Sequence, residues 1–295
     1  MKPSRLSVLI TLCLIFFISF TWAANKEEMK LRLFKGDRYV YVVSQENKMQ
    51  ESPQKVMMDQ KMALKIDHSV IDRMANGNFL VQATFKSFTL ELNYNGITQR
   101  YQSDTVDVTN KYYPILNFLT DVKLTYEVSP EGKVSKITGF EPIKKKIETD
   151  SRLASLIRFF GNEQFIRELY QYIPAAHVEV GDQWIGEGVM PDLMNLKYDI
   201  QFTLKEVSAQ NLKLDQKASI EFSTEAPTQD GKSKLLVETG TQKGNLLLDP
   251  ATRLCLSSDI HQQMEISAPG QNKEDGDPMP PITLISRTKV VMVKK

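Results

Sequence analysis

The sequence predicts a mainly β protein of the α+β class, in which two helices from the middle of the chain pack against a large, bent antiparallel sheet system. Three observations predict it: apolar and polar residues alternate over long stretches, turn signals recur between these stretches, and residues 141–175 lose the alternation. The pattern also allows two related β units, residues 24–140 and 176–295, separated by the helical segment 141–175.

The strands are predicted by residues that repeat with a period of two. Residues 58–67 alternate Met, Leu and Ile with Asp and Lys, as a half-buried antiparallel strand does. The next alternation runs through residues 79–85 and resumes in shifted phase at Phe88, so a β-bulge near Lys86-Ser87 is expected to bend the sheet. Tight turns are predicted at residues 76–77, 95–96, 129–130 and 249–250.

One short motif occurs twice: Gly36-Asp37 and Gly181-Asp182 are each followed by one residue and then an aromatic residue. Amphipathic strands, an Asn-containing turn and a Pro-containing hairpin then follow in the same order, although the spacing is not constant. One interpretation is a duplicated β unit that flanks a helical insert. The alternative is that antiparallel sheets reuse the same turn chemistry.

The middle of the chain carries helical spacing. Apolar residues recur every three or four positions in residues 153–160 and again in residues 165–172. Asn162 is a predicted N-cap for the second helix, and Pro174 is expected to stop it.

The first residues predict a secretory signal peptide, residues 1–23. A short cationic start precedes the apolar run Leu6–Phe20, and small residues then provide a cleavage site. The alternative is an uncleaved anchor, but the run is shorter than the roughly 20 residues that span a bilayer. Cys13 follows Leu12 inside this run, so it offers no usable lipobox. We therefore expect a periplasmic or secreted protein with no membrane span after cleavage.

The mature chain is nearly neutral. The full chain has a net charge of +1, and the predicted signal removes Lys2 and Arg5 but no acid, which leaves −1. This balance argues against a nucleic-acid partner. Cys255 is the only cysteine after cleavage, so no intramolecular disulfide can form.

Four segments together carry a family resemblance. They are "LRLFKGDRYVY", "LTYEVSPEGKVSKITGFEPI", "IPAAHVEVGDQW" and "GNLLLDPATRLCLSSDIHQQMEI". The chain resembles a family of exported bacterial proteins, common in Bacteroidota-type envelopes, that is catalogued only as a domain of unknown function. Many members look like lipoproteins, whereas this chain lacks a usable lipobox. The resemblance implies a cell-envelope or secreted protein and supplies no catalytic residue and no substrate.

No metal or catalytic constellation is readable around the three histidines, His68, His177 and His261. Asp259 and His261 share a strand face and could begin a metal site, but no third ligand lies nearby. Ser257, Asp259 and His261 lie on one short strand, where they cannot assemble a triad.

Sulfur and cationic residues have structural explanations. Cys255 alternates with leucines and is expected to be a buried thiol. Methionines at 49, 57, 58 and 62 could bind Cu(I), yet Met58 and Met62 share a strand face in a way that suits core packing. Residues 144–146 are three lysines, expected on an exposed helix face or at a helix end and not in a nucleic-acid patch.

Three function classes remain open, and we expect no catalytic, cofactor-binding or metal-ligating residue and no cofactor. The first class is a non-catalytic binding protein for a lipid or other apolar or amphipathic ligand, or for an envelope protein partner; it predicts a pocket. The second is a structural or assembly protein of the envelope, which predicts an apolar patch or a free sheet edge. The third is an enzyme, which predicts converging polar residues with perturbed pKa in a cleft.

Overall fold

The computed structural model describes residues 26–107, 109–110, 112–120, 122–149, 160–174, 177–190, 196–220, 226–227, 234–267 and 280–293. The predicted signal peptide and residues 153–159 of the first predicted helix lie outside these ranges.

Strands make up most of the described chain. Those of the first half are β1 (Arg38–Ser52), β2 (Lys55–Arg73), β3 (Phe79–Tyr94), β4 (Ile97–Gln102), β5 (Lys123–Val128) and β6 (Val134–Thr138). Those of the second half are β7 (Gln183–Met190), β8 (Leu196–Val207), β9 (Leu212–Ile220), β10 (Ala226–Pro227), β11 (Lys234–Leu248), β12 (Cys255–Ser267) and β13 (Ile282–Val293). The helical elements are α2 (Tyr113–Leu116), the 3-10 turn η1 (Asn117–Leu119), α3 (Glu141–Thr149) and α5 (Glu163–Glu168).

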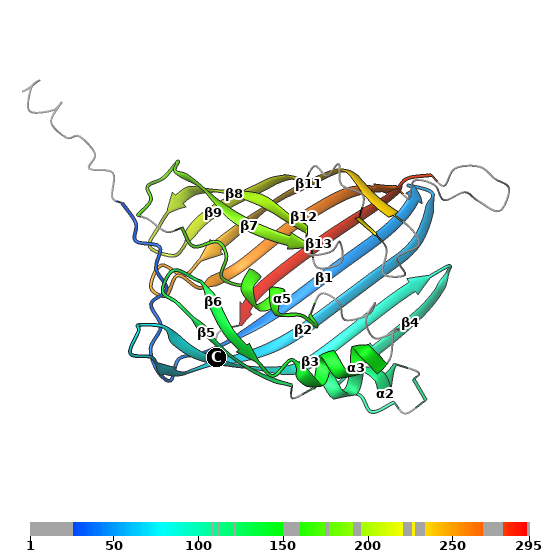
Figure 1. The fold of residues 1–295 in the computed structure, drawn as a ribbon, viewed down its shortest axis with the longest axis horizontal. Coiled ribbons are helices and arrows are strands. Elements are labelled where there is room, and N and C mark those ends of the chain that lie inside the picture. Colours follow the sequence, from blue (N-terminus) through cyan, green and yellow to red (C-terminus); the bar gives the residue numbers. More distant parts are fainter. Residues whose placement is uncertain are drawn as a thin grey trace, which may run out of the picture.

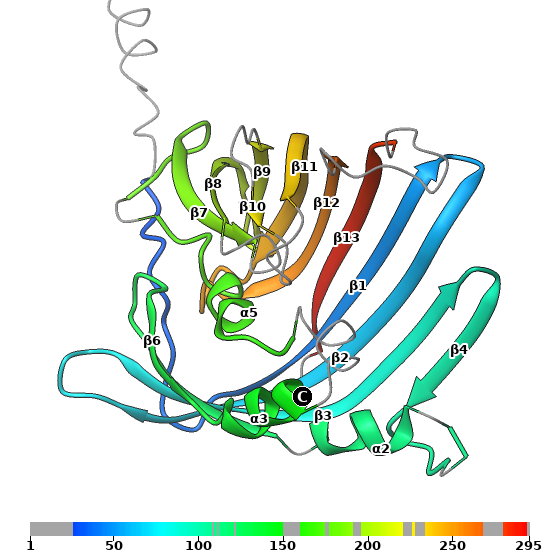
Figure 2. The ribbon, with the colours of Figure 1, turned by 45° about the vertical axis from the view of Figure 1, so that its right-hand side comes forward.

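The strands form a single thirteen-stranded sheet with the order β6-β5-β3-β2-β1-β13-β12-β11-β9-β8-β7, while β4 pairs with β3 and β10 with β11. The last strand, β13, runs antiparallel to the first, β1, and this pairing joins the two halves of the chain (Figure 1). The predicted antiparallel sheet system is therefore confirmed, and strands from both predicted β units share it. Figure 2 shows the sheet curving into an open cup with α5 on its concave side.

The predicted bulge is present and contributes to this bend. Lys65 pairs with Ser87, whereas the next residue, Ile66, pairs with Phe85, so Lys86 is the extra residue. A bulge increases the local twist and bends the strand that carries it.

The Gly-Asp motif has the same local structure at both positions. Each glycine N–H donates to a carbonyl of the second strand of its half, and each aspartate carboxylate accepts from the N–H three residues earlier. The distances are 2.8 Å for Gly36 to Val70 and for Gly181 to Leu204, 2.7 Å for Phe34 to Asp37, and 2.9 Å for Glu179 to Asp182. Both glycines have positive φ, +96° and +101°, which residues with a Cβ rarely adopt. Gene duplication, and the unit boundaries drawn from it, stay predictions.

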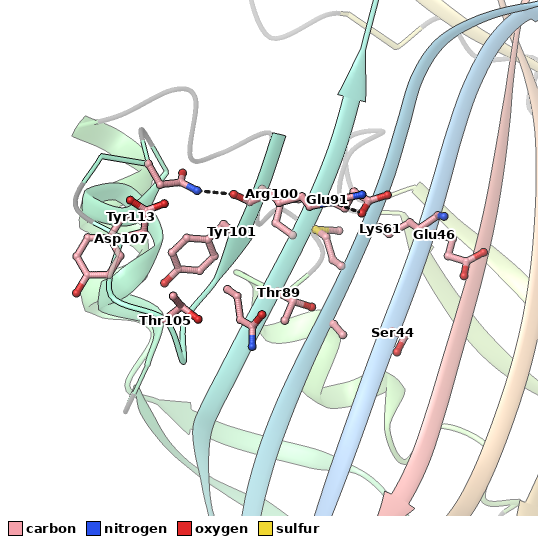
Figure 3. Close-up of a pocket in the computed structure, with 15 residues that line it drawn as sticks. Ser44, Glu46, Lys61, Thr89, Glu91, Arg100, Tyr101, Thr105, Asp107 and Tyr113 are labelled. Carbon is pink, nitrogen blue, oxygen red and sulfur yellow. Dashed lines mark hydrogen bonds and ion pairs between the residues drawn. The ribbon is translucent and has the colours of Figure 1, made fainter. Parts of the chain in front are cut away.

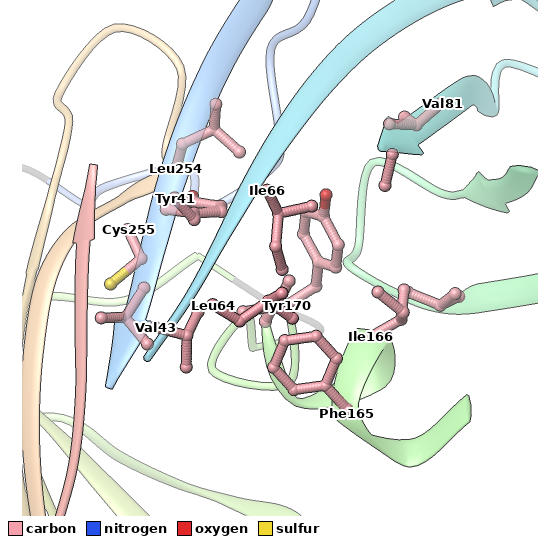
Figure 4. Close-up of a cluster of buried hydrophobic side chains, with 14 of the residues drawn as sticks. Tyr41, Val43, Leu64, Ile66, Val81, Phe165, Ile166, Tyr170, Leu254 and Cys255 are labelled. Atoms are coloured by element: carbon pink, nitrogen blue, oxygen red, sulfur yellow. The ribbon is translucent and has the colours of Figure 1, made fainter. Parts of the chain in front are cut away.

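The buried faces of the strands form one large core on the concave side of the cup. Leu64 and Ile66 of β2 and Phe202 of β8 are almost wholly inaccessible. Phe165 and Ile166 of α5 point from the helix toward this cluster (Figure 4). The helix thus covers apolar side chains of the concave face, which an open sheet could not bury alone.

Asn162 caps α5 as predicted, since its side chain accepts a hydrogen bond from the Phe165 N–H at 3.2 Å. The helix ends at Glu168, earlier than the apolar spacing through Tyr172 predicted. Tyr170 and Tyr172 are both fully buried. A continued helix would place two residues with this spacing on different faces, so burying both requires the chain to leave the helix.

A cluster of tyrosine hydroxyls anchors the segment after α5. The Tyr170 hydroxyl lies 2.8 Å from both the Tyr39 and the Tyr126 hydroxyls, and the Tyr172 hydroxyl donates to the Arg253 carbonyl at 3.0 Å. These bonds join the segment to β1, to β5 and to the turn before β12.

The remaining helical elements also contribute to the core, through Leu116 of α2, Leu119 of η1 and Ile143 of α3. Ile143 of α3 is buried while Lys144–Lys146 are exposed, as predicted for an exposed helix face. The sequence did not predict α2 and η1, which are too short to show helical periodicity. None of the helices in the described ranges has the length and apolar character needed to cross a bilayer.

Candidate ligand-binding site

A cavity of about 510 Å³ lies between the concave face of the sheet and the segment of α5. Its walls come from eight strands (β1, β2, β7, β8, β9, β11, β12 and β13) and from residues 162–172. This volume falls in the range of small-molecule sites, about 300–1000 Å³.

The strand register sorts the inward side chains into rows that cross the cup. One row, here called the amide row, consists of directly opposed residues on five adjacent strands: Gln60, Asn47, Ser286, Gln262 and Gln242. Hydrogen bonds follow it. Asn47 donates to Gln60 at 3.2 Å and accepts from Ser286 at 2.8 Å, while Gln242 accepts from Gln262 at 3.3 Å.

A second row lies two residues away from the amide row along each strand, and it contains both polar and apolar side chains. It contains Gln45 of β1, Thr288 of β13 and Gln216 of β9, and Ile260 and Gly244 lie between the last two. Among the described residues, the Gln45 Oε1 acceptor and the Gln216 Nε2 donor are buried without a hydrogen-bond partner. Such atoms are rare inside proteins and costly, so both are candidates to bind a ligand.

The amide row and the second row together are here called the polar band, and apolar rows flank it on both sides. Toward one end of the strands lie Met58, Met49, Leu284 and Met264 in register. Toward the other lie Val43, Val290 and Leu246, with Ser258 of β12 between the last two. Successive inward residues are about 7 Å apart along a strand. The cavity therefore alternates apolar, polar and apolar along its axis.

Tyr198 contributes a hydroxyl from β8. It donates to Gln242 Oε1 at 2.8 Å, and burial raises the pKa of Tyr198 above its usual range. Gly188 lies opposite on β7, where a Cβ would come within 2.3 Å of the Tyr198 ring. The glycine thus leaves room for the ring to lie over β7, as aromatic residues do over strand glycines.

Glu168 is the charged side chain on the cavity wall within the described part of the chain. It is half-buried, its Oε1 accepts from Gln164 at 3.4 Å, and burial raises the pKa of Glu168 to about 7. No ion pair to it is found in the described ranges. A carboxyl of this kind can exchange a proton near neutral pH, but among the described residues no second carboxyl lines the cavity beside it.

Replacing Glu168 by Gln is expected to stabilise the protein above about pH 7. Because the folded-state pKa exceeds the ordinary value of 4.5, the unfolded state loses its proton first. The contribution of Glu168 to stability is therefore fully present below about pH 4.5 and is lost as the pH rises toward 7. We expect a gain of about 1–3 kcal/mol at pH ~8 and little change at pH ~4, measured by urea unfolding. Glu163→Gln, on the same helix but not on the cavity wall, is the control. Equal stability of E168Q and wild type at both pH values would contradict a raised pKa for Glu168.

Cys255 also lines the cavity and is a buried thiol, as the sequence predicted. Burial raises the pKa of Cys255 to about 12, so the thiolate that a nucleophile requires is scarce at neutral pH.

The methionines fall on the faces that the alternation predicted. Met49, Met58 and Met62 line the cavity, whereas Met57 does not. They lie among aliphatic and amide side chains. No group of three His, Cys, Asp or Glu side chains suited to a metal occurs within the described ranges.

Asp259 and His261 lie on the same face of β12, as expected, and their side chains are 3.2 Å apart. Arg287 of β13 holds Asp259 with two hydrogen bonds of 2.9 and 2.6 Å. The nearby Arg287 guanidinium keeps the pKa of Asp259 below its usual range. This cluster lies away from the cavity, whose wall includes neither Ser257 nor His261. His177 is exposed, and His68 is buried in the core.

A second hollow of about 520 Å³ lies beside β4 (Figure 3). Its wall carries charged side chains, among which Arg100 Nε lies 2.8 Å from Glu91 Oε2. Because this pair is mostly exposed to solvent, it contributes little to stability.

Sequence reasoning missed the amide row. The signal was present, since Gln and Asn stand at inward positions of β1, β2, β11 and β12, but only the register shows that they form one line.

Comparison with known families gives one match: residues 76–254 fit the model of a family described as "Family of unknown function (DUF6263)". The chain belongs to this family. The match covers more than half of the chain, so the predicted membership in a family of unknown function is confirmed, while the predicted bacterial origin stays a prediction. No curated protein matches this DUF6263 chain.

A solved structure shares the fold of the DUF6263 chain, and a second one matches it weakly. Lipovitellin, from a structure concerned with lipid–protein interactions, shares 10% sequence identity with a TM-score of 0.54 over 89% of this chain. This chain covers 26% of the lipovitellin chain. A domain from Vibrio parahaemolyticus, described as that of an outer membrane lipoprotein-sorting protein, has a TM-score of 0.18 and 7% identity over 86% of this chain and 83% of its own. The similarity to lipovitellin is one of fold alone.

Proposed function

We propose that this protein is a non-catalytic, exported cell-envelope protein that binds an apolar or amphipathic ligand in the concave cavity. The observation that carries the proposal is the cavity itself, about 510 Å³, with walls of aliphatic and aromatic side chains that a band of polar side chains crosses. A site of that composition suits a ligand that removes apolar surface from water.

Two further features support the proposal. The sheet fold is shared with lipovitellin, a protein whose structure describes lipid–protein interactions. The first residues of the chain have the composition of a secretory signal peptide, which supports a periplasmic or secreted location.

A second candidate is a structural or assembly role with an envelope protein partner. Strand β7 favours it, because β8 is its neighbour in the sheet and no described strand covers its other edge. Ile185 of β7 is 60% exposed. Such an edge can pair with another chain.

Native mass spectrometry of residues 24–295, purified without detergent from a bacterial periplasm, tests the binding proposal. We expect a co-purifying lipid or other apolar molecule that is released on denaturation. A mass equal to that of the chain alone, together with no uptake of added lipid, would contradict ligand binding and favour the assembly role.

Thr288→Trp is expected to block the cavity. Thr288 faces inward from the middle of β13. A large indole there would occupy ligand volume, and we expect binding of the neutral dye Nile red to weaken at least about tenfold, or about 1.4 kcal/mol. Val291→Trp, on the opposite face of the same strand where Val291 is 47% exposed, is the matched control. Equal dye binding by both variants would place the ligand elsewhere.

A further inference from the structure

The polar band across the cup is unusual for a site that holds only hydrocarbon. Gln60 and Gln242 of the amide row are buried, and Gln45 and Gln216 of the next row are also buried. Burying an amide without full hydrogen bonding costs free energy. A cavity selected to hold plain hydrocarbon would carry aliphatic side chains at these positions.

The band retains unused hydrogen-bonding capacity. A glutamine side chain has two N–H donors and an acceptor oxygen with two lone pairs. The bonds along the amide row use only part of this capacity. Gln45 adds an unpaired acceptor and Gln216 an unpaired donor, both on the cavity wall.

The charges of the cavity exclude one class of polar group. No lysine, arginine or histidine lines the cavity in the described part of the chain. An anionic headgroup in the band would be desolvated without a cation, and it would share the cavity with Glu168. The band therefore suits a polar group without charge.

We infer that the ligand carries an uncharged hydrogen-bonding group, such as an ester, an amide or a hydroxyl, between two apolar segments, and that the polar band recognises it. The inference rests on the proposed function and specifies its ligand class. The apolar rows on both sides, each about 7 Å from the band, bind the two apolar segments. An acylated molecule with a neutral linkage has this pattern, whereas a free fatty acid does not.

Three probes of equal chain length test the inference: N-octyloctanamide, heptadecane and heptadecanoate, each measured by displacement of Nile red at about pH 8, where a carboxylic acid is ionised. We expect the wild type to bind the amide at least about tenfold more tightly than the carboxylate. The double variant Gln45→Leu/Gln216→Leu is expected to weaken the amide by about tenfold and to leave heptadecane unchanged or tighter.

Gln263→Leu provides the matched control, because Gln263 is exposed on the opposite face of β12. It is expected to change none of the three affinities, and circular dichroism checks that each variant is folded. If all probes bind and the double variant weakens none selectively, or if the carboxylate binds as tightly as the amide, the inference is overturned and the proposed function stands. If the folded wild type binds neither dye nor probe, the proposed function itself fails.

Discussion

Phe165→Ala is expected to lower the free energy of unfolding by about 3–5 kcal/mol, the usual cost of removing a buried phenylalanine ring. Phe165 is 2% exposed, and its ring packs edge-to-face on Phe160 with centroids 5.2 Å apart. It is the α5 side chain that both fills the core and lines the cavity. Urea unfolding measures the change, which corresponds to a Tm lowered by roughly 10 °C in a chain of this size.

The control for this experiment lies one residue earlier. Gln164 is half-buried on the same helix, and Gln164→Ala should cost less than about 1 kcal/mol. If Phe165→Ala is no more destabilising than Gln164→Ala, then α5 does not unfold cooperatively with the sheet, and its place over the cavity would need another explanation.

His68→Phe is expected to flatten the acid side of the stability profile. His68 has no accessible surface; its ring stacks on Tyr39 at 4.8 Å and meets the edge of Tyr41 at 5.4 Å. Burial lowers the pKa of His68 from 6.5 to about 3, although a backbone interaction with Ile66 and the charge of Asp67 oppose this shift. The imidazole is therefore neutral in the folded protein over most of the accessible pH range.

The sign of the effect follows from proton binding. Between about pH 6.5 and pH 3 the unfolded chain binds a proton at His68 that the folded chain does not, so stability falls as pH falls through this window. The loss is about 1.4 kcal/mol per pH unit, or about 3 kcal/mol between pH ~7 and pH ~4. Above pH ~6.5 the contribution of His68 to stability is fully present.

Urea unfolding at several pH values compares three proteins. The difference between wild type and His68→Phe should grow as the pH falls, in favour of the variant. Val70→Ala, a buried neighbour on β2, is the control and should lower the free energy of unfolding by a similar amount at every pH. Parallel profiles for wild type and H68F would show that His68 binds its proton at the same pH in the folded and the unfolded chain.

Features that depend on a few consecutive residues could be predicted from the sequence. The alternation of residues 58–67 specified which side chains of β2 face inward, and the phase slip at Lys86 specified the bulge, because each strand residue points to the face opposite its neighbour. Asn162 specified the start of α5, since a cap needs only its own side chain and an N–H three residues later.

The candidate site could not be predicted in this way, because its parts are distant in the sequence. Asn47 meets Ser286 across the β1–β13 pair, a separation of 239 residues. Each glutamine of the amide row looks like an ordinary strand residue on its own. The end of α5 was also missed, because the hydroxyl bonds of Tyr170 and Tyr172 reach strands and turns that local spacing does not show.

The sequence by itself determined the fold class, the faces of the strands, the main turns and the buried state of Cys255, because period-two patterns and turn chemistry act over short distances. Only the tertiary structure decided that both halves share one sheet, that the sheet curves around α5 as an open cup, and that a polar band crosses the cavity. Strand order and register depend on which distant segments pair, and the energy of that pairing comes from a core that exists only once the chain has folded.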